Sequence, residues 1–149
     1  MTLQENETHV LLAEDDDDDY LIFSMAIAET KLAVALTRAQ DGENLMKVLS
    51  EHIPDILFLD MHMPCKHGRE CLKEIRSNRR YDDLPIIIFS SFSDPNTIEY
   101  CFREGSNLYT IKPNSISELT EILRRILVID WKKTLYYPRQ SEFVINPLT

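Results

Sequence analysis

The sequence predicts an α/β fold in which helices cover both faces of a parallel sheet, and two observations indicate it. Short apolar runs alternate five times with helical patterns, which is the order of successive right-handed βα units. Three of these runs end abruptly in charged side chains, at Glu14 and Asp15, at Asp60 and at Lys112. The carboxyl ends of parallel strands form the ligand crevice in open α/β folds, so these charges are expected to meet in one site.

Each expected element has its own signal in the sequence. Short apolar runs are assigned to strands, and the amphipathic stretches between them to helices. The expected strands span residues 9–14, 33–38, 56–60, 86–89 and 108–111, and the expected helices span residues 18–31, 43–51, 69–77, 95–104 and 116–131. Asp41 and Asp94 are expected to cap the second and fourth helices, and Ser115 with Glu118 has the spacing of a capping box.

The strand order decides whether the charged strand ends converge. A flavodoxin-like, doubly wound five-stranded sheet, which is a three-layer (βα)5 sandwich, has the order 2-1-3-4-5 and is the leading prediction. In that order the first and third strands are neighbours, so Glu14, Asp15 and Asp60 lie where the winding reverses and ligands bind. A parallel sheet wound in one direction only would separate these residues.

Length and composition indicate one compact domain with its own core. The chain has 149 residues, of which 44% are hydrophobic, so it needs neither disulfides nor metal to fold. Its formal net charge of -9 argues against nucleic acid as a partner, because duplex binding depends on clustered Lys and Arg. No apolar run approaches the roughly 20 residues that span a bilayer, and the N-terminus does not resemble a signal peptide. We expect a cytoplasmic protein without a membrane partner.

Cysteine and histidine residues offer a zinc site as an alternative. The three cysteines form no CxxC pair, which suits a reducing compartment without a disulfide framework. His62, Cys65, His67 and Cys71 are close in sequence, but structural zinc sites usually show paired ligands at short spacing on both sides. We therefore interpret these residues as parts of a loop that enters a helix.

An acidic run from Glu14 to Asp19 lies between the first apolar run and the first helix. The later aspartates are interpreted as mostly structural, because the helix dipole favours negative charge at a helix N-terminus. Glu14 and Asp15 can face the crevice together with Asp60. Three neighbouring carboxylates need a cation, and oxygen ligands with open positions suit Mg2+, for which Mn2+ can substitute. The same acids disfavour flavin or nucleotide, because a phosphate-binding turn has to present backbone N–H groups.

Five positions at the strand ends are informative in combination. They are an acidic pair, a third acid, a hydroxyl and a lysine before proline, namely Glu14, Asp15, Asp60, Ser90 and Lys112. With them, residues 9–129 resemble the receiver domain of bacterial two-component response regulators. Tyr109, three residues before the lysine, matches the family's switch aromatic, and Gly68 matches the glycine that opens its third helix. The resemblance implies the CheY-like form of the predicted fold.

The resemblance implies a phosphorelay protein that catalyses its own phosphorylation and dephosphorylation and is not an enzyme for another substrate. Asp60 attacks phosphorus as a carboxylate nucleophile, while Mg2+, Lys112 and the Ser90 hydroxyl stabilise the phosphoryl oxygens. The implied metal ligands are Glu14, Asp15, Asp60 and the backbone carbonyl of His62. A cis peptide bond between Lys112 and Pro113 is also implied.

Ser90 and Tyr109 form the switch that the resemblance implies. Phosphate on Asp60 would draw Ser90 inward and let Tyr109 turn in beside the fourth strand, which alters the face made by the fourth helix, fifth strand and fifth helix. Plain core packing is an equally good interpretation of Tyr109. His62 and Phe92, which follow Asp60 and Ser90 by two residues each, would frame the path of attacking water, and the bulk of Phe92 is expected to slow hydrolysis.

The expected organisation is a receiver domain over residues 1–131, with its core at 9–129, followed by a tail over residues 132–149. The tail is too short for an output domain, so a stand-alone receiver with a C-terminal extension is expected. Aromatic and apolar residues in the tail leave two interpretations open. One is a frayed terminus, and the other is an arm that packs on its own domain or on a second copy.

The expected partner is a sensor histidine kinase or a phosphotransfer protein, with a phytochrome-type kinase as one candidate. A homodimer would use the face from the fourth to the fifth helix together with the tail. Two other functions compete with this one. A constitutive docking module would have lost an acid or the lysine, and a Mg2+-dependent phosphatase with an aspartate nucleophile would carry a second aspartate where this chain has His62.

Overall fold

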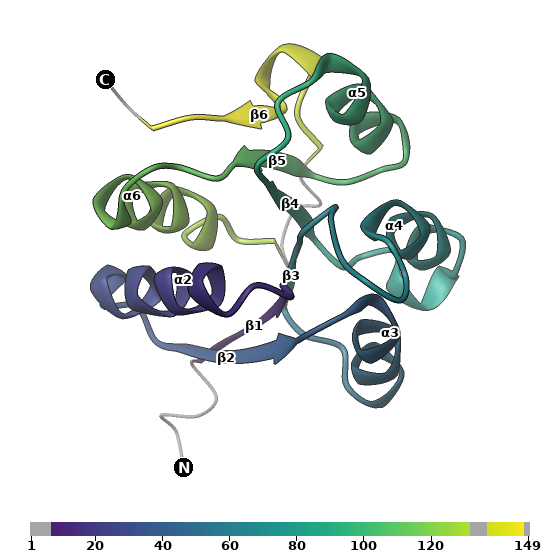
Figure 1. Ribbon diagram of the computed structural model, residues 1–149, viewed down its shortest axis with the longest axis horizontal. Helices are drawn as coiled ribbons and strands as arrows, with labels where there is room; N and C mark the ends of the chain where they lie inside the picture. Colours follow the sequence, from purple (N-terminus) through teal and green to yellow (C-terminus); the bar gives the residue numbers. More distant parts are fainter. Residues whose placement is uncertain (1–6, 132–136, 148–149) are drawn as a thin grey trace.

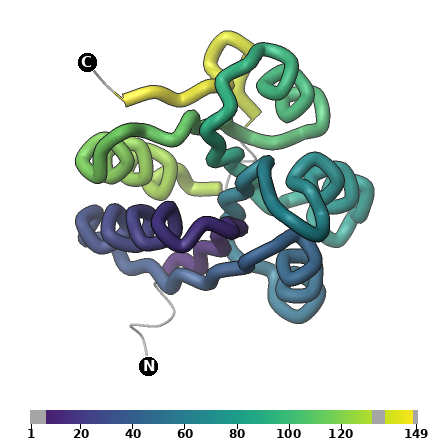
Figure 2. The backbone as a smooth tube through the Cα atoms, in the orientation of Figure 1, coloured from purple at the N-terminus to yellow at the C-terminus, as the bar shows by residue number. Residues whose placement is uncertain are grey.

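The computed structural model describes residues 7–131 and 137–147 of the chain. A parallel six-stranded sheet with the order β2-β1-β3-β4-β5-β6 lies between two layers of helices (Figures 1 and 2). The strands are β1 (Thr8–Ala13), β2 (Val34–Ala39), β3 (Ile56–Leu59), β4 (Ile86–Ser90), β5 (Leu108–Ile111) and β6 (Val144–Ile145). The helices are α2 (Asp17–Thr30), α3 (Gly42–Glu51), α4 (Gly68–Arg76), α5 (Pro95–Arg103) and α6 (Ile116–Leu127), with short 3-10 turns η1 (Arg79–Tyr81) and η2 (Gln140–Glu142).

The predicted doubly wound order is confirmed for the first five strands. β1 pairs with β2 on one side and with β3 on the other, so the winding reverses at β1 and β3. In register, Ala13 lies opposite Leu59. The residues that follow these two strand ends therefore leave the sheet side by side, which brings the β1–α2 loop next to Asp60.

Helix starts follow the local signals in the sequence. The side chains of Asp41, Asp94 and Ser115 accept hydrogen bonds from backbone N–H groups of the first turns of α3, α5 and α6, as predicted. Asp16 caps α2 in the same way, accepting from the N–H of Asp18. These contacts satisfy N–H groups that have no partner within the helix, and they fix where each strand-to-helix loop ends.

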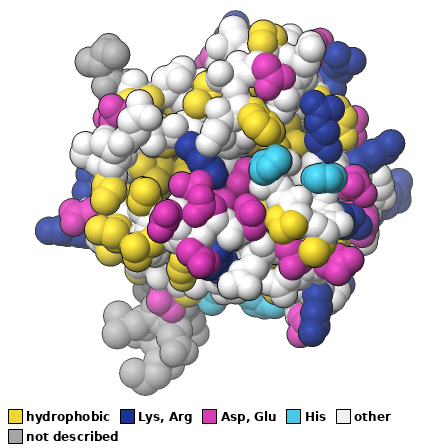
Figure 3. Space-filling view, in the orientation of Figure 1, with side chains coloured by type: hydrophobic (Ala, Val, Ile, Leu, Met, Phe, Trp, Pro, Cys, Tyr) yellow, Lys and Arg dark blue, Asp and Glu magenta, His cyan; other side chains and the backbone are white. Residues whose placement is uncertain are grey.

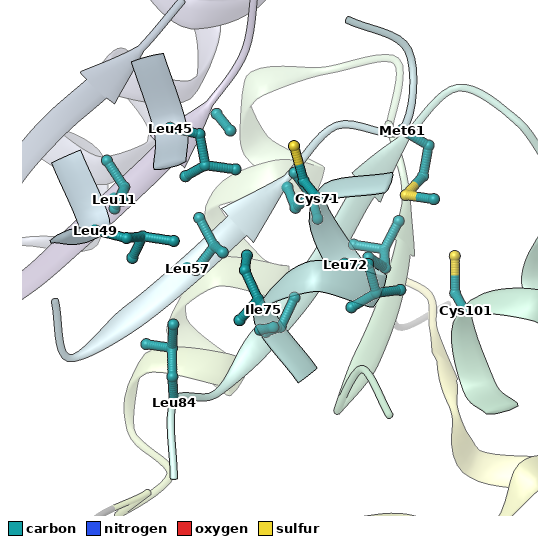
Figure 4. Close-up of a cluster of buried hydrophobic side chains, with 14 of the residues drawn as sticks. Leu11, Leu45, Leu49, Leu57, Met61, Cys71, Leu72, Ile75, Leu84 and Cys101 are labelled. Carbon is teal, nitrogen blue, oxygen red and sulfur yellow. The ribbon is translucent and has the colours of Figure 1, made fainter. Parts of the chain in front are cut away.

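Two apolar layers hold the helices to the sheet. Strand residues alternate between the faces, so one layer packs under α3, α4 and α5 and the other under α2 and α6. Figure 4 shows the first layer, where Leu11 and Leu57 of the sheet meet Leu45 and Leu49 of α3 and Ile75 of α4. The strands β1, β3 and β4 are apolar along nearly their whole length because both of their faces are covered.

The last helix is shorter than expected, since α6 ends at Leu127 and not at Trp131. Trp131 folds back instead, and its indole N–H donates to the carbonyl of Ile126 at 3.2 Å. Trp131 contacts the apolar layer under α2 and α6 from this non-helical position. The amphipathic pattern in the sequence therefore continues past the end of the helix. Within the part of the chain that the structure describes, no helix has the length and apolar character of a membrane span.

The described part of the tail lies on its own domain. β6 adds to the sheet as a parallel strand beside β5, with Tyr109 opposite Val144 and Thr110 opposite Ile145. The Phe143 side chain is fully buried and packs edge-to-face on Phe102 of α5, with ring centroids 5.2 Å apart. The expected five-stranded sheet thus has a sixth strand. Residues 132–136, which include the start of the predicted tail, lie outside the described residues.

Candidate functional site

Three acids meet at the carboxyl end of the sheet, where the winding reverses. Glu14 and Asp15 follow β1, and Asp60 follows β3; each offers a carboxylate oxygen, and these oxygens lie within 4.8 Å of one another. Glu14 and Asp60 are buried, whereas Asp15 is exposed. Figure 3 shows acidic side chains gathered in the middle of this face of the molecule, with basic side chains at the edge of the group. The sequence-based expectation that these three carboxylates converge is therefore met.

Lys112, which follows β5, places its ammonium group in contact with the acids. Its Nζ lies 2.7 Å from Oε1 of Glu14, 2.8 Å from Oδ2 of Asp19 and 3.2 Å from Oδ2 of Asp60. The backbone N–H of Lys112 donates to the carbonyl of Ser90 at 2.8 Å, which fixes where the lysine leaves the sheet. One ammonium group therefore contacts carboxyl groups from three different segments of the chain.

The pKa values show how strongly these groups depend on one another. Burial raises the pKa of Glu14 to about 8, and the hydrogen bond from Lys112 opposes this shift while Asp60 adds to it. Burial alone would lower the pKa of Lys112, but hydrogen bonds to Asp19 and Glu14 and the charge of Asp60 raise it above its ordinary value. The lysine is therefore protonated at neutral pH, and a divalent cation would favour the charged form of Glu14.

The backbone around Asp60 is closely packed. The N–H of His62 donates to Oδ1 of Asp60 at 3.1 Å, so one carboxylate oxygen is held by the chain and the other by Lys112. Gly68 begins α4 directly against this turn, and a Cβ atom there would lie 2.5 Å from the carbonyl oxygen of Asp60. Only glycine allows α4 to begin so close to the residue after β3.

Ser90 and Tyr109 lie behind the acidic group and are both fully buried. The Ser90 hydroxyl accepts from the N–H of Phe92 at 3.1 Å, and the Tyr109 hydroxyl donates to the carbonyl of Phe92 at 2.7 Å. Burial raises the pKa of Tyr109 to about 12, although a hydrogen bond with Ser90 lowers it. The two predicted switch residues are thus linked to each other and to the loop after β4.

The rings of His62 and Phe92 meet at the rim of the site. Their centroids are 5.7 Å apart in an edge-to-face arrangement, and both residues are exposed to solvent. They come from the loops after β3 and β4, which carry Asp60 and Ser90. The two residues predicted to frame the path of water therefore lie together.

The expected cis peptide bond before Pro113 is wrong. The peptide bond between Lys112 and Pro113 is trans, and no described peptide bond is cis. A trans bond is the intrinsically favoured form even before proline, by about 0.5–1 kcal/mol.

The cysteines and histidines considered for zinc do not gather into a metal-binding group. Among the described residues, the acids Glu14, Asp15 and Asp60 form the single such group, and it includes no cysteine or histidine. Cys71 is buried with its sulfur toward the carbonyl of Gly42.

Two residues of the site were not identified from the sequence. Arg38, at the end of β2, donates to the backbone carbonyls of Glu14 and Asp15, at 3.0 and 3.2 Å, and forms a 2.9 Å ion pair with Asp17. Asp19, which we interpreted as a structural helix-start acid, contacts Lys112. For Arg38 the signal was a basic residue at the end of the neighbouring strand; for Asp19 no local signal separates it from the other acids.

A doubly wound sheet with this acid group at its switch point and a lysine after β5 is the arrangement of the class of receiver domains. The sequence matches the family described as response regulator receiver domain over residues 10–124. This chain belongs to that family.

Individual relatives agree with this assignment. The chain is 33% identical over 122 residues to the two-component response regulator ORR13 of Oryza sativa subsp. japonica, covering 79% of this chain and 97% of the relative. It is similar to the structure of the phosphorylated cyanobacterial phytochrome response regulator RcpA, with 26% identity, a TM-score of 0.77, and coverage of 89% and 99%. It is also similar to the response regulator RPA3017 in red light signaling of R. palustris, with 25% identity, a TM-score of 0.75, and coverage of 95% and 99%.

Proposed function

We propose that this chain is a stand-alone response regulator whose Asp60 accepts a phosphoryl group from a phosphohistidine of a sensor kinase or phosphotransfer protein. A carboxylate oxygen of Asp60 attacks phosphorus, the bond between phosphorus and the imidazole nitrogen breaks, and the imidazole keeps the electron pair. The observation that carries the proposal is the contact between Asp60 and Lys112, 3.2 Å apart, within a group of three acids at the switch point of the sheet. The chain is itself the substrate, so we do not class it as an enzyme.

The residues present fit a divalent cation of the Mg2+ type. All three side chains in the acidic group offer oxygen, and the exposed position of Asp15 leaves one side of the group open to water. Glu14, Asp15, Asp60 and the backbone carbonyl of His62 would hold the ion, and Mn2+ would substitute for it. When bound, the cation would neutralise the carboxylates and polarise the phosphoryl oxygens.

Lys112 and Ser90 have separate tasks in this proposal. Lys112 already contacts Asp60, so it can pair with a phosphoryl oxygen with little movement. The Ser90 hydroxyl contacts the loop N–H of Phe92 and, through its hydrogen bond, Tyr109. A phosphoryl oxygen that draws the Ser90 hydroxyl toward Asp60 would therefore change the contacts of Tyr109, which is how we propose the switch begins.

The proposed output surface is the face made by α5, β5 and α6. Tyr109 is already turned in, with its hydroxyl on the carbonyl of Phe92. β6 covers the edge of β5, so a second copy in a homodimer would meet α5, α6 and the tail and not a free strand edge. His62 and Phe92 complete the proposal as residues that control the entry of hydrolytic water.

The kinase and the location are also part of the proposal. The names of RcpA and RPA3017 connect those two proteins with phytochrome and red light, which supports a phytochrome-type kinase as the donor for this chain. The three cysteines are free, which supports the reducing cytoplasm as its location. The net charge of -9 supports a protein partner and not nucleic acid.

The test is the reaction with acetyl phosphate, with and without Mg2+, followed by intact mass. We expect a Mg2+-dependent gain of one phosphoryl group in the wild type and none in Asp60→Asn. Asp55→Asn is a suitable control, because it removes a carboxylate at the opposite end of β3. No gain in folded wild-type protein would favour a docking module. Turnover of small phosphate esters would favour a phosphatase.

A further inference from the structure

Asp19 is a fourth carboxylate at the site, and its position differs from that of the other three. It lies in the first turn of α2, and its Oδ2 is 2.8 Å from Nζ of Lys112, closer than the 3.2 Å of Asp60. Its side chain is 32% exposed, whereas the Glu14 side chain is fully buried. Asp19 therefore approaches Lys112 from the mouth of the site, while Glu14 approaches from the interior.

Asp19 is not part of the group that can bind a cation. That group consists of Glu14, Asp15 and Asp60. A bound cation would share the charge of Glu14 and Asp60, and it would leave Asp19 as the counter-ion that belongs to Lys112 alone.

We infer that Asp19 is a positioning residue that competes with the phosphoryl group of Asp60 for Lys112. The inference rests on the proposed phosphoacceptor function and adds a regulator of the same site. An ammonium group has three N–H donors, and in this structure carboxylates from Glu14, Asp19 and Asp60 surround it. A phosphoryl oxygen must take one of these places.

The competition is electrostatic as well as geometric. A phosphoryl group held by Lys112 brings its negative charge close to the Asp19 carboxylate, and partial burial of the lysine reduces the screening by water. Asp19 therefore holds Lys112 in place before the reaction. Afterwards it weakens the attraction between Lys112 and the phosphoryl group. Removing the charge of Asp19 should favour every state in which an anion is bound on Asp60.

The test compares Asp19→Asn with Asp18→Asn. Both substitutions remove one negative charge from the first turn of α2, but Asp18 is exposed and only Asp19 contacts Lys112. Beryllofluoride, which mimics a phosphoryl group on aspartate, is titrated by fluorine NMR at saturating Mg2+. We expect Asp19→Asn to bind it on the order of fivefold more tightly than Asp18→Asn, with Mg2+ affinity equal in the two variants. Asp19→Glu, which keeps the charge, should not bind it more tightly than wild type.

The outcomes separate the inference from the function on which it rests. Equal beryllofluoride affinity in Asp19→Asn and Asp18→Asn, with normal binding by wild type, would overturn the inference alone. A weaker Mg2+ affinity only in Asp19→Asn would also overturn it, because Asp19 would then be a metal ligand. Failure of folded wild-type protein to bind beryllofluoride would overturn the proposed function and the inference together. Circular dichroism of each variant shows whether it is folded.

Discussion

The ring of Phe143 lies against the ring of Tyr109, with centroids 6.1 Å apart, and the Phe143 carbonyl accepts the backbone N–H of Tyr109 at 3.0 Å. Both side chains are fully buried. The C-terminal segment thus covers the residue that we propose as the switch aromatic. Any movement of Tyr109 away from the core has to displace Phe143 or pass it.

Replacement of Phe143 by alanine tests how firmly the tail is held. The change removes a fully buried ring from contacts with Phe102 and Tyr109, so the free energy of unfolding should fall by about 3–5 kcal/mol. Urea denaturation measures it. Phe92→Ala removes the same ring from a site that is 42% exposed and should cost much less. Equal losses in the two variants would mean that the tail does not dock in solution as it does here.

Gly68→Ala tests the close approach of α4 to Asp60. The added Cβ would lie 2.5 Å from the Asp60 carbonyl oxygen, so the turn must shift, at a cost of roughly 1–3 kcal/mol in stability. The free energy of unfolding, measured by urea denaturation, and the rate of phosphorylation by acetyl phosphate should both decrease. Glu70→Ala, an exposed change in the same helical turn, serves as the control. Unchanged stability and rate in Gly68→Ala would show that the backbone at this turn shifts to admit a Cβ atom at no measurable cost.

Phe92→Ala tests the proposed control of water entry. The exposed ring of Phe92 meets His62 at the rim of the site, and its removal opens a path to the phosphoryl group. Dephosphorylation should accelerate on the order of tenfold, which corresponds to about 1.4 kcal/mol in barrier height. Loss of phosphoryl mass with time gives the rate, and Phe92→Leu, which keeps much of the bulk, should stay near wild type. An unchanged rate in Phe92→Ala would defeat the hypothesis.

Thiol labelling tests the burial of the cysteines and its effect on pH dependence. Burial raises the pKa of Cys71 to about 11 and that of Cys101 to about 12, while Cys65 is exposed. The thiolate is the reactive form, so the two buried thiols stay protonated and unreactive until the pH approaches these values. Iodoacetamide at pH 8 should add one label to the native wild type and none to Cys65→Ser, as read by intact mass. Two or three labels on native protein would contradict the packing of α4 or α5.

Elements with strong local signals were predicted well. The buried strands are apolar along nearly their whole length, and Asp41, Asp94 and Ser115 cap the helices where expected, because these signals act within a few residues. β6 was not predicted, since a strand of two residues has no periodicity of its own. It forms because Phe143 finds a buried place beside α5 and because the edge of β5 offers unpaired backbone groups.

The sequence by itself determined the α/β class and placed Glu14, Asp15, Asp60 and Lys112 at the carboxyl edge of a parallel sheet, because these residues come at the ends of apolar strands and parallel strands end at the same edge. The pairing of β1 with β3, which brings the acids of these two strand ends together, came from the tertiary structure. Only the tertiary structure decided which other side chains reach that edge. Asp19 and Asp18 are equivalent in sequence, but the rotation of α2 against the sheet turns only Asp19 toward Lys112. Arg38 holds the acidic loop because β2 pairs beside β1, and such a contact depends on side-chain direction, which no local pattern encodes.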